Sequence, residues 1–176
     1  MRFMIVPVLV ALMATAAMAV SVTLPDTSQT TVFTANVSAQ AAVVVPAGVS
    51  FAVTNVASST ASAAQSVTIT NVCLVDTQKL KISLQANSAA FTPPAGTTTW
   101  NANDVSWNAA TWTNATGAAG TLSNAAYNAV ATSSANPAGV STAGLTFTLA
   151  ANATPNASIR NGAHTLTATW KFESVP

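Results

Sequence analysis

Charged side chains are scarce in this chain of 176 residues. It has 5 lysines and arginines and 4 aspartates and glutamates, so that 5% of its residues are charged while 50% are hydrophobic. An average globular domain is about 25% charged. Because binding to nucleic acids depends on lysine and arginine neutralising phosphates, the composition excludes a nucleic-acid partner. Disordered chains combine high charge with low hydrophobicity, so we expect a folded protein, and its weakly charged surface favours self-association.

Residues that carry acid–base or metal chemistry are also few. The chain has one histidine, His164, and one cysteine, Cys73. A zinc site needs three or four His, Cys or acidic ligands, and acid–base catalysis needs a titratable group beside a partner. We therefore expect no enzyme, no catalytic residue, no metal ligands and no cofactor, although an oxygen-only calcium site near Asp104 stays open. Cys73, which has no partner for an intrachain disulfide, is predicted to be a buried thiol in a strand.

The first residues have the pattern of a secretory signal peptide. Arg2 precedes an apolar run over residues 3–13, and residues 17–19 read Ala-Met-Ala, a small-x-small cleavage site. We predict a signal peptide over residues 1–19 and export to the periplasm, the cell surface or the medium. The apolar run is shorter than the about 20 residues of a membrane span, so no span is expected after cleavage. Residues 20–176 are predicted to form one domain.

Hydrophobic residues alternate with Thr, Ser and Lys along most of the mature chain. The alternating apolar sets are Val49, Phe51 and Val53; Val67 and Ile69; Leu80, Ile82 and Leu84; Leu145, Phe147 and Leu149; and Leu166, Ala168, Trp170 and Phe172. This period of two predicts strands with one face in a core and the other in water. The unbroken apolar run over residues 43–45 predicts a strand covered on both faces. His164 is predicted to be half-buried at the start of the last strand.

Turn sequences separate these predicted strands. They lie at residues 46–48, 93–96, 137–139 and 161–162. The last of them, Asn-Gly, suits a type I′ turn because both residues tolerate positive φ. We predict an all-β fold, namely an Ig-like β-sandwich of about seven to nine antiparallel strands after the signal peptide, with a jelly roll as the alternative.

Residues 97–143 lack this clean alternation and are rich in Ala, Asn, Thr and Gly. We expect irregular strands with long loops here, and helical structure around residues 123–130. A stretch of this length without regular structure is unusual in a compact domain and is often functional.

The tryptophans allow two interpretations. Trp107, which alternates with Val105, and Trp170 on the last predicted strand are expected in the core. Trp100 and Trp112 are less determined. They either pack inside the fold or, together with Asn103, bind a sugar through exposed rings and amide hydrogen bonds.

The start of the mature chain is a short alternating segment with Val20, Val22 and Leu24 on one face, followed by Pro25. Such a segment can add as a strand to an exposed sheet edge of another molecule, with alternate side chains filling pockets. Head-to-tail addition does not close on itself and builds a filament. The alternative is that residues 20–24 pair within their own domain as its first strand.

Three stretches near the two ends of the mature chain carry a resemblance to a known family. Residues 34–37 read Thr-Ala-Asn-Val, residues 43–46 read Val-Val-Val-Pro, and residues 161–170 read Asn-Gly-Ala-His-Thr-Leu-Thr-Ala-Thr-Trp. They resemble the first part and the final strand of exported bacterial fimbrial-subunit domains. The resemblance implies an Ig-like fold and a structural role in a surface assembly such as a pilus or fimbria, with a part in cell adhesion. Many such subunits have a disulfide that Cys73 alone cannot form, so the disulfide-free fimbrial and spore-coat-like subunits fit better.

We therefore expect a secreted or cell-surface structural subunit that associates with itself or with homologous surface subunits, with strand addition by its N-terminal segment as the candidate mode of contact. The alternative is a secreted carbohydrate-binding β-sandwich that uses exposed tryptophans, with a glycan as its partner.

Overall fold

The computed structural model describes residues 21, 23–25, 27, 30–137, 139–153 and 158–176. The chain divides into two units, Met1–Asn36 and Val37–Pro176. The expected signal peptide lies outside the described residues, as do Val20 and Val22. Within the described residues, no helix is both long and apolar enough to cross a membrane.

The second unit is all-β, which confirms the fold class that the alternation predicts. Its strands, in the part of the chain that the structure describes, are β1 (Gln40–Val44), β2 (Thr60–Ala61), β3 (Gln65–Cys73), β4 (Lys79–Ala86), β5 (Val105–Trp107), β6 (Ala115–Gly117), β7 (Gly120–Thr121), β8 (Asn128–Ser133), β9 (Ser141–Leu145), β10 (Phe147–Leu149) and β11 (Ala168–Val175). Two short 3-10 helices, η1 (Ala102–Asp104) and η2 (Ala151–Ala153), accompany them.

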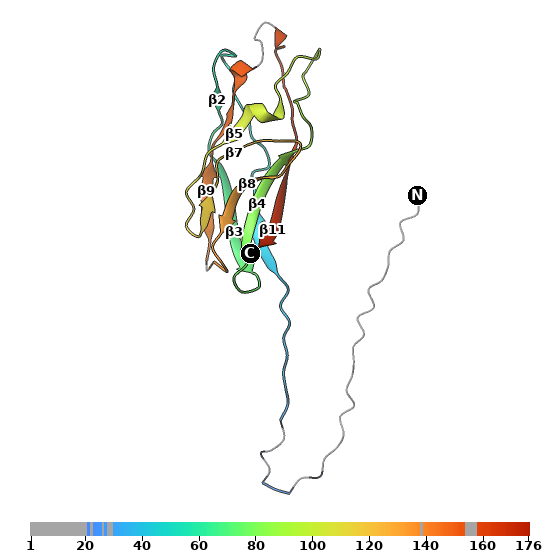
Figure 1. The fold of residues 1–176 in the computed structure, drawn as a ribbon, viewed down its shortest axis with the longest axis vertical. Coiled ribbons are helices and arrows are strands. Elements are labelled where there is room, and N and C mark those ends of the chain that lie inside the picture. Colours follow the sequence, from blue (N-terminus) through green and yellow to red (C-terminus); the bar gives the residue numbers. More distant parts are fainter. Residues whose placement is uncertain (1–20, 22, 26, 28–29, 138, 154–157) are drawn as a thin grey trace, which may run out of the picture. The chain divides into compact units, whose positions relative to one another are not determined.

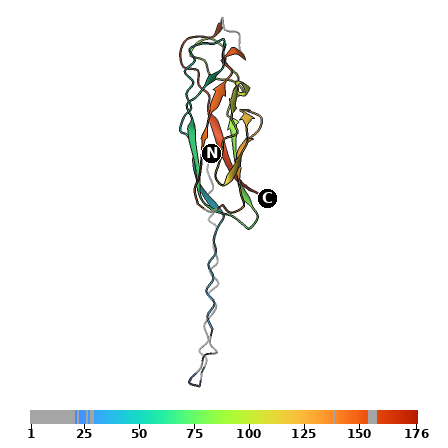
Figure 2. The ribbon, with the colours of Figure 1, turned by 90° about the vertical axis from the view of Figure 1, so that its left-hand side faces the viewer.

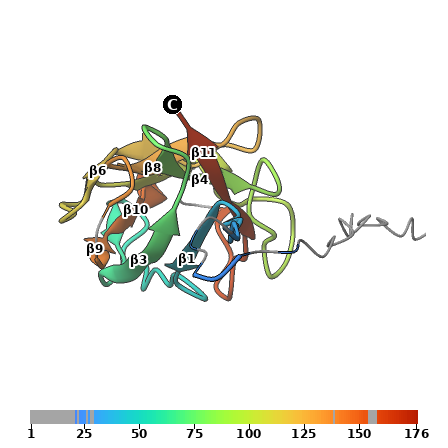
Figure 3. The same cartoon turned by 90° about the horizontal axis from the view of Figure 1, so that it is seen from below.

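The strands form two layers. Their orders are β1-β3-β9, β2-β10-β5-β7 and β11-β4-β8-β6, with antiparallel pairing in each sheet. Only Thr146 separates β9 from β10, so the first two sheets continue one another in a single layer. Figure 3 shows β1, β3 and β9 in this layer and β11, β4 and β8 in the other. The strands of both layers run in the same general direction (Figures 1 and 2), as in an aligned β-sandwich.

The core lies between the two layers and is built from the predicted alternating residues. Val67 and Ile69 of β3 point into it from one layer, and Ile82 and Leu84 of β4 point into it from the other. Full burial of one such side chain contributes about 1.5–3 kcal/mol. Trp107 is also buried, as expected, and its ring lies 6.3 Å from the ring of Phe147.

Two of the expected strands differ from the prediction. Val43 and Val44 end β1, but Val44 is exposed, so the expectation that residues 43–45 form a strand covered on both faces is wrong. Val49, Phe51 and Val53 are half-buried in alternation with exposed neighbours, as predicted, yet they form no strand. A strand is defined by pairing with a neighbour, and among the described residues this segment pairs with none.

The helical structure expected around residues 123–130 is also wrong. Residues 124–126 form bends, and β8 begins at Asn128, paired on one side with β4 and on the other with β6. Its Val130 is fully buried in the core, so tertiary packing overrides the helical tendency of the alanines. At residues 161–162 only Gly162 has a positive φ, of 132°, so the predicted type I′ turn does not form.

Candidate functional site: an open seam between two edge strands

One side of the sandwich is closed by the chain itself. β6 ends one layer and β7 ends the other, and residues 118–119 carry the chain directly from one to the other. Gly117 and Gly120 make this crossing possible. A Cβ atom on Gly117 would lie less than 3.0 Å from the carbonyl oxygen of Ala110, and one on Gly120 would lie equally close to the ring of Trp107. The Trp107 indole also donates a hydrogen bond to the Ala118 carbonyl over 3.0 Å.

The opposite side ends in two edge strands, β1 in one layer and β11 in the other. β11 pairs with β4 on one side, as strand F pairs with strand C in an immunoglobulin-type sandwich, although β5 precedes β8 along the chain, whereas strand D follows strand C′ in that fold. In that fold a strand G pairs with the outer edge of strand F. Among the described residues no strand occupies this position beside β11. Every second residue of β11 therefore directs its N–H and C=O groups away from β4, along an unpaired edge.

The inward-facing side chains of β11 are incompletely covered. Phe172 pairs with Ile82 of β4, so both side chains point toward the same face of the sheet. Ile82 is 0% exposed, whereas Phe172 is 43% exposed. Trp170, expected in the core, is only half-buried beside its buried partner Leu84. The difference within each pair shows that burial fails at the outer edge of this layer and not along its whole face.

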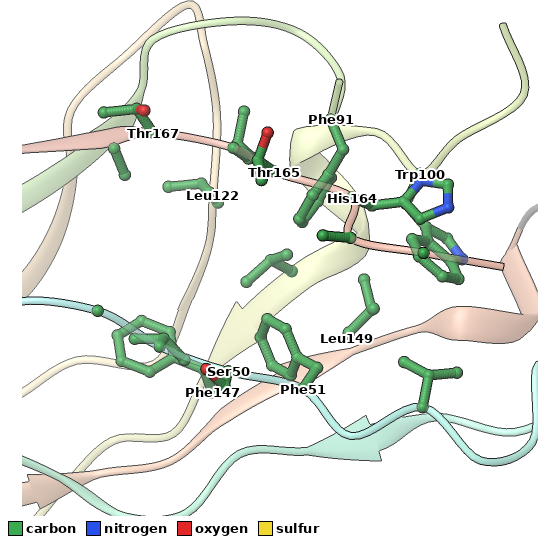
Figure 4. A pocket seen from close by; sticks show the side chains of 18 of the residues that line it. Ser50, Phe51, Phe91, Trp100, Leu122, Phe147, Leu149, His164, Thr165 and Thr167 are labelled. Atoms are coloured by element: carbon green, nitrogen blue, oxygen red, sulfur yellow. The ribbon is translucent and has the colours of Figure 1, made fainter. Parts of the chain in front are cut away.

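A hollow of about 910 Å³ lies next to this edge. Residues 46–56, which follow β1, form one wall, and residues 159–170, which lead into β11, form the other. Figure 4 shows Phe51 on the first wall and His164 on the second, with Phe147 and Leu149 of β10 also lining the space. Except for Arg160, the residues that line it carry no formal charge when His164 is neutral.

A second hollow, of about 350 Å³, lies between β1 and β11 themselves. Its lining includes Ala39 and Val43 on one side and Leu80 and Phe172 on the other. Both hollows are thus bordered by β1 or the segment after it and by β11 or the segment before it. We name this region, the two hollows with their bordering chain segments, the open seam.

His164 is a fixed part of the seam wall. Its Nε2 lies 3.0 Å from the Arg160 carbonyl oxygen and its Nδ1 lies 2.8 Å from the Thr99 hydroxyl. A carbonyl only accepts, so the neutral ring donates from Nε2 and accepts the Thr99 hydroxyl proton at Nδ1. The ring also lies against Trp100, with centroids 4.8 Å apart. These contacts, together with its half-buried position before β11, agree with the predicted environment of His164.

The tryptophans named as candidate sugar ligands are buried. Trp100 donates its indole N–H to the Ala151 carbonyl over 3.0 Å, and the Trp112 indole nitrogen has no hydrogen-bond partner among the described residues. Neither ring presents an open face for stacking on a sugar. Asn103 remains exposed on η1. The structure therefore does not bring these three residues together as one accessible surface.

The acidic and sulfur-containing side chains also have plain roles. The Asp104 carboxylate accepts a 2.7 Å hydrogen bond from the Asn101 backbone N–H and caps η1. Within the described residues, no group of three His, Cys, Asp or Glu could hold a metal. Cys73 ends β3 and is half-buried rather than buried. Glu173, on the outer face of β11, pairs with Lys171 at 2.5 Å and Lys81 at 3.5 Å.

The predicted assembly strand is covered only in part by the structure. Val20 and Val22 lie outside the described residues, and Leu24 is exposed in a bend. Sequence reasoning missed the residues just before β1, where Val32 and Phe33 are highly exposed without regular secondary structure. Large apolar side chains exposed side by side often mark an interaction surface, so Val32 and Phe33 are the clearest signal of a contact site that sequence reasoning overlooked.

Comparison of the chain with known protein families, curated proteins and solved structures finds no match. The structure by itself defines a β-sandwich with one closed side and one open seam.

Proposed function

We propose that this protein is an exported structural subunit of a bacterial surface fibre, of pilin or fimbrial type, whose copies join by β-strand addition. An N-terminal segment of one copy enters the open seam of the next and takes the unfilled position beside β11. The observation that carries this proposal is the unpaired edge of β11 together with the 43% exposure of its inward-facing Phe172.

The chemistry of the seam favours an extended peptide over other occupants. Its border offers backbone N–H and C=O groups, which a strand satisfies with ladder hydrogen bonds. Its interior is lined mainly by apolar side chains, with a few polar ones such as Arg160 and His164, and accepts every second side chain of such a strand. A small apolar molecule fills the hollow but leaves the backbone edge unpaired, which is the feature that a strand corrects.

The geometry of such an assembly leads to a fibre. The donated segment and the seam are different parts of the chain, so each contact is head-to-tail, and each added copy again presents a seam. The low charge of the sequence supports close contact between copies, because few charged side chains need to lose their water.

The first experiment measures self-association of the full chain, exported and purified from a bacterial host. Size-exclusion chromatography with light scattering is expected to show a concentration-dependent series of oligomers, and electron microscopy is expected to show fibres. A particle that stays monomeric at every concentration contradicts the proposal.

A matched pair of variants then locates the contact. Phe172→Asp places a charge on the inward face at the open edge, and Thr169→Asp places the same charge on the exposed outer face of the same strand. Phe172 already contacts water, so its replacement is compatible with folding. We expect the first variant to prevent association and the second to associate normally. If the two variants associate to the same extent, the seam is not the site of contact between copies.

A further inference from the structure

We infer that the segment that enters the seam is residues 30–37 of a second copy, and that the Phe33 ring occupies the larger hollow. This inference rests on the proposed strand addition and identifies the donor segment, which sequence analysis placed at residues 20–24. Phe33 is 92% exposed and Val32 is 85% exposed, in a stretch without regular secondary structure. Two large apolar side chains in water are unfavourable, and they provide a driving force for docking.

The segment has the side-chain pattern of a half-buried strand. In an extended conformation Phe33, Ala35 and Val37 lie on one face, and Val32, Thr34 and Asn36 lie on the other. From residue 33 onward the first face is entirely apolar, and the second is mostly polar. The segment contains no charged residue, so its insertion brings no charge into the apolar hollow.

The size and character of the hollow favour the aromatic residue of this face. The hollow of about 910 Å³ is bordered by several aromatic rings, among them Phe51, Trp100 and Phe147, whereas the smaller one, of about 350 Å³, is bordered by a single aromatic ring, that of Phe172. Aromatic rings pack favourably edge-to-face against one another. Phe33 therefore matches the larger hollow, while Ala35 and Val37 fit narrower parts of the seam.

The connection to β1 indicates a second copy as the donor. Residues 30–37 come shortly before β1, which itself borders the seam. For its own segment to lie beside β1, the chain has to reverse direction just before Gln40. Tight hairpin turns need residues that tolerate positive φ, usually Gly, Asn or Asp. Residues 37–39 are Val, Ser and Ala, so the sequence does not supply such a turn.

Phe33→Asp and Val32→Asp in the full chain test the inference, because these adjacent exposed residues lie on opposite faces of the extended segment. Association is expected to weaken by at least about a hundredfold for the first variant and by less than about threefold for the second. Sedimentation equilibrium measures both constants. At concentrations too low for association, thermal unfolding of both variants is expected to match the parent chain, since neither side chain is buried within a single copy.

A cross-link gives an independent measurement. One protein carries Phe33→Cys and a second carries Leu166→Cys, which lies on the seam wall, and both carry Cys73→Ser. Oxidation of the mixture is expected to give a disulfide-linked heterodimer, and Val32→Cys in place of Phe33→Cys is expected to give little.

The outcomes distinguish the identity of the donor segment from strand addition at the seam. Equal association of the Phe33 and Val32 variants, with no cross-link at position 33, overturns the inference about the donor. If Phe172→Asp still prevents association in that case, strand addition at the seam stands and another segment is the donor. If Phe172→Asp also associates normally, the proposed function itself is overturned.

Discussion

The two sides of this β-sandwich are built from similar alternating strands but end in opposite ways. On the closed side, residues 118–119 carry the chain from β6 to β7, and Trp107 packs against Gly120 at a distance that excludes any side chain there. On the open side, β1 and β11 both lack an outer neighbour within the described residues. The closed side is therefore complete within one chain, whereas the open side has backbone and apolar groups that a further strand would satisfy.

The comparison shows that an alternating pattern of apolar side chains does not guarantee that the apolar face is covered by neighbouring strands. Phe172 and Ile82 lie side by side on one face and follow the same pattern, yet they differ by 43 percentage points in exposure. The pattern determines which face a residue occupies, and the neighbouring strand determines whether that face is covered. A sheet edge whose inward-facing apolar side chains are not buried by a neighbouring strand is a candidate interface.

The largest expected effect comes from removing an indole on the closed side. Trp107→Ala is expected to lower the free energy of unfolding by about 3–5 kcal/mol, because it leaves a cavity in a packed region. Trp170→Ala on the open side is expected to cost only about 1–2 kcal/mol, since that ring is already half-exposed. Urea unfolding of the two variants measures the difference, and equal losses contradict the contrast between the two sides.

Glycine substitutions are expected to show the same contrast at a smaller scale. Gly117→Ala places a Cβ atom less than 3.0 Å from a backbone oxygen and is expected to cost about 1–3 kcal/mol. Gly48→Ala, on the seam wall, meets no atom within 4 Å. It is expected to be neutral or to stabilise by about 0.4–1 kcal/mol, because alanine restricts the unfolded chain. Thermal unfolding provides the measurement, and a cost at Gly48 as large as at Gly117 shows that the wall is more tightly packed than described.

The smallest effect concerns the outer face of β11. The hydrogen bond from Lys171, with the charges of Lys171 and Lys81, holds the pKa of Glu173 below its ordinary value of 4.5. The folded state therefore binds this proton less readily than the unfolded state. The small stabilisation is present above pH 4.5 and is lost as the pH falls through the lowered pKa of the folded state.

Glu173→Gln is expected to remove this contribution to the pH dependence of stability. Comparison of the melting temperatures of the two proteins between about pH 3 and pH 6 measures it, with Asp76→Asn, which removes an exposed carboxylate in the loop between β3 and β4, as a control for the loss of one negative charge. A parent chain and a Glu173→Gln variant with parallel profiles show that the ion pair contributes nothing measurable, as is common for exposed pairs.

The sequence alone predicted the all-β class and most of the inward-facing residues, because a period of two directly reports side-chain direction. It also predicted correctly that Trp107 is buried. It could not predict that residues 49–53 remain unpaired, since pairing depends on what lies opposite a strand. The burial of Trp100 and Trp112 was equally undetermined, because it results from contacts between residues far apart along the chain.

The open seam could not be predicted from composition or alternation. A sequence shows which strands are present, but the lack of a neighbour beside β11, among the residues that the structure describes, becomes visible only in the sheet order. The exposed Phe33 was accessible in principle, since it alternates with Ala35 and Val37. Its proposed role depends on the larger hollow, which is formed by residues from both halves of the chain.

The contact between Trp100 and His164 also has a practical consequence. Trp100 lines the larger hollow with its ring 4.8 Å from the imidazole, whereas Trp107 and Trp112 are buried away from that lining. Trp170 also lines this hollow, so entry of an occupant changes the polarity around the indoles of Trp100 and Trp170 while leaving Trp107 and Trp112 in place. The protein thus contains its own fluorescent reporter, and the wavelength of its tryptophan emission follows filling of the hollow in real time without a dye or a label.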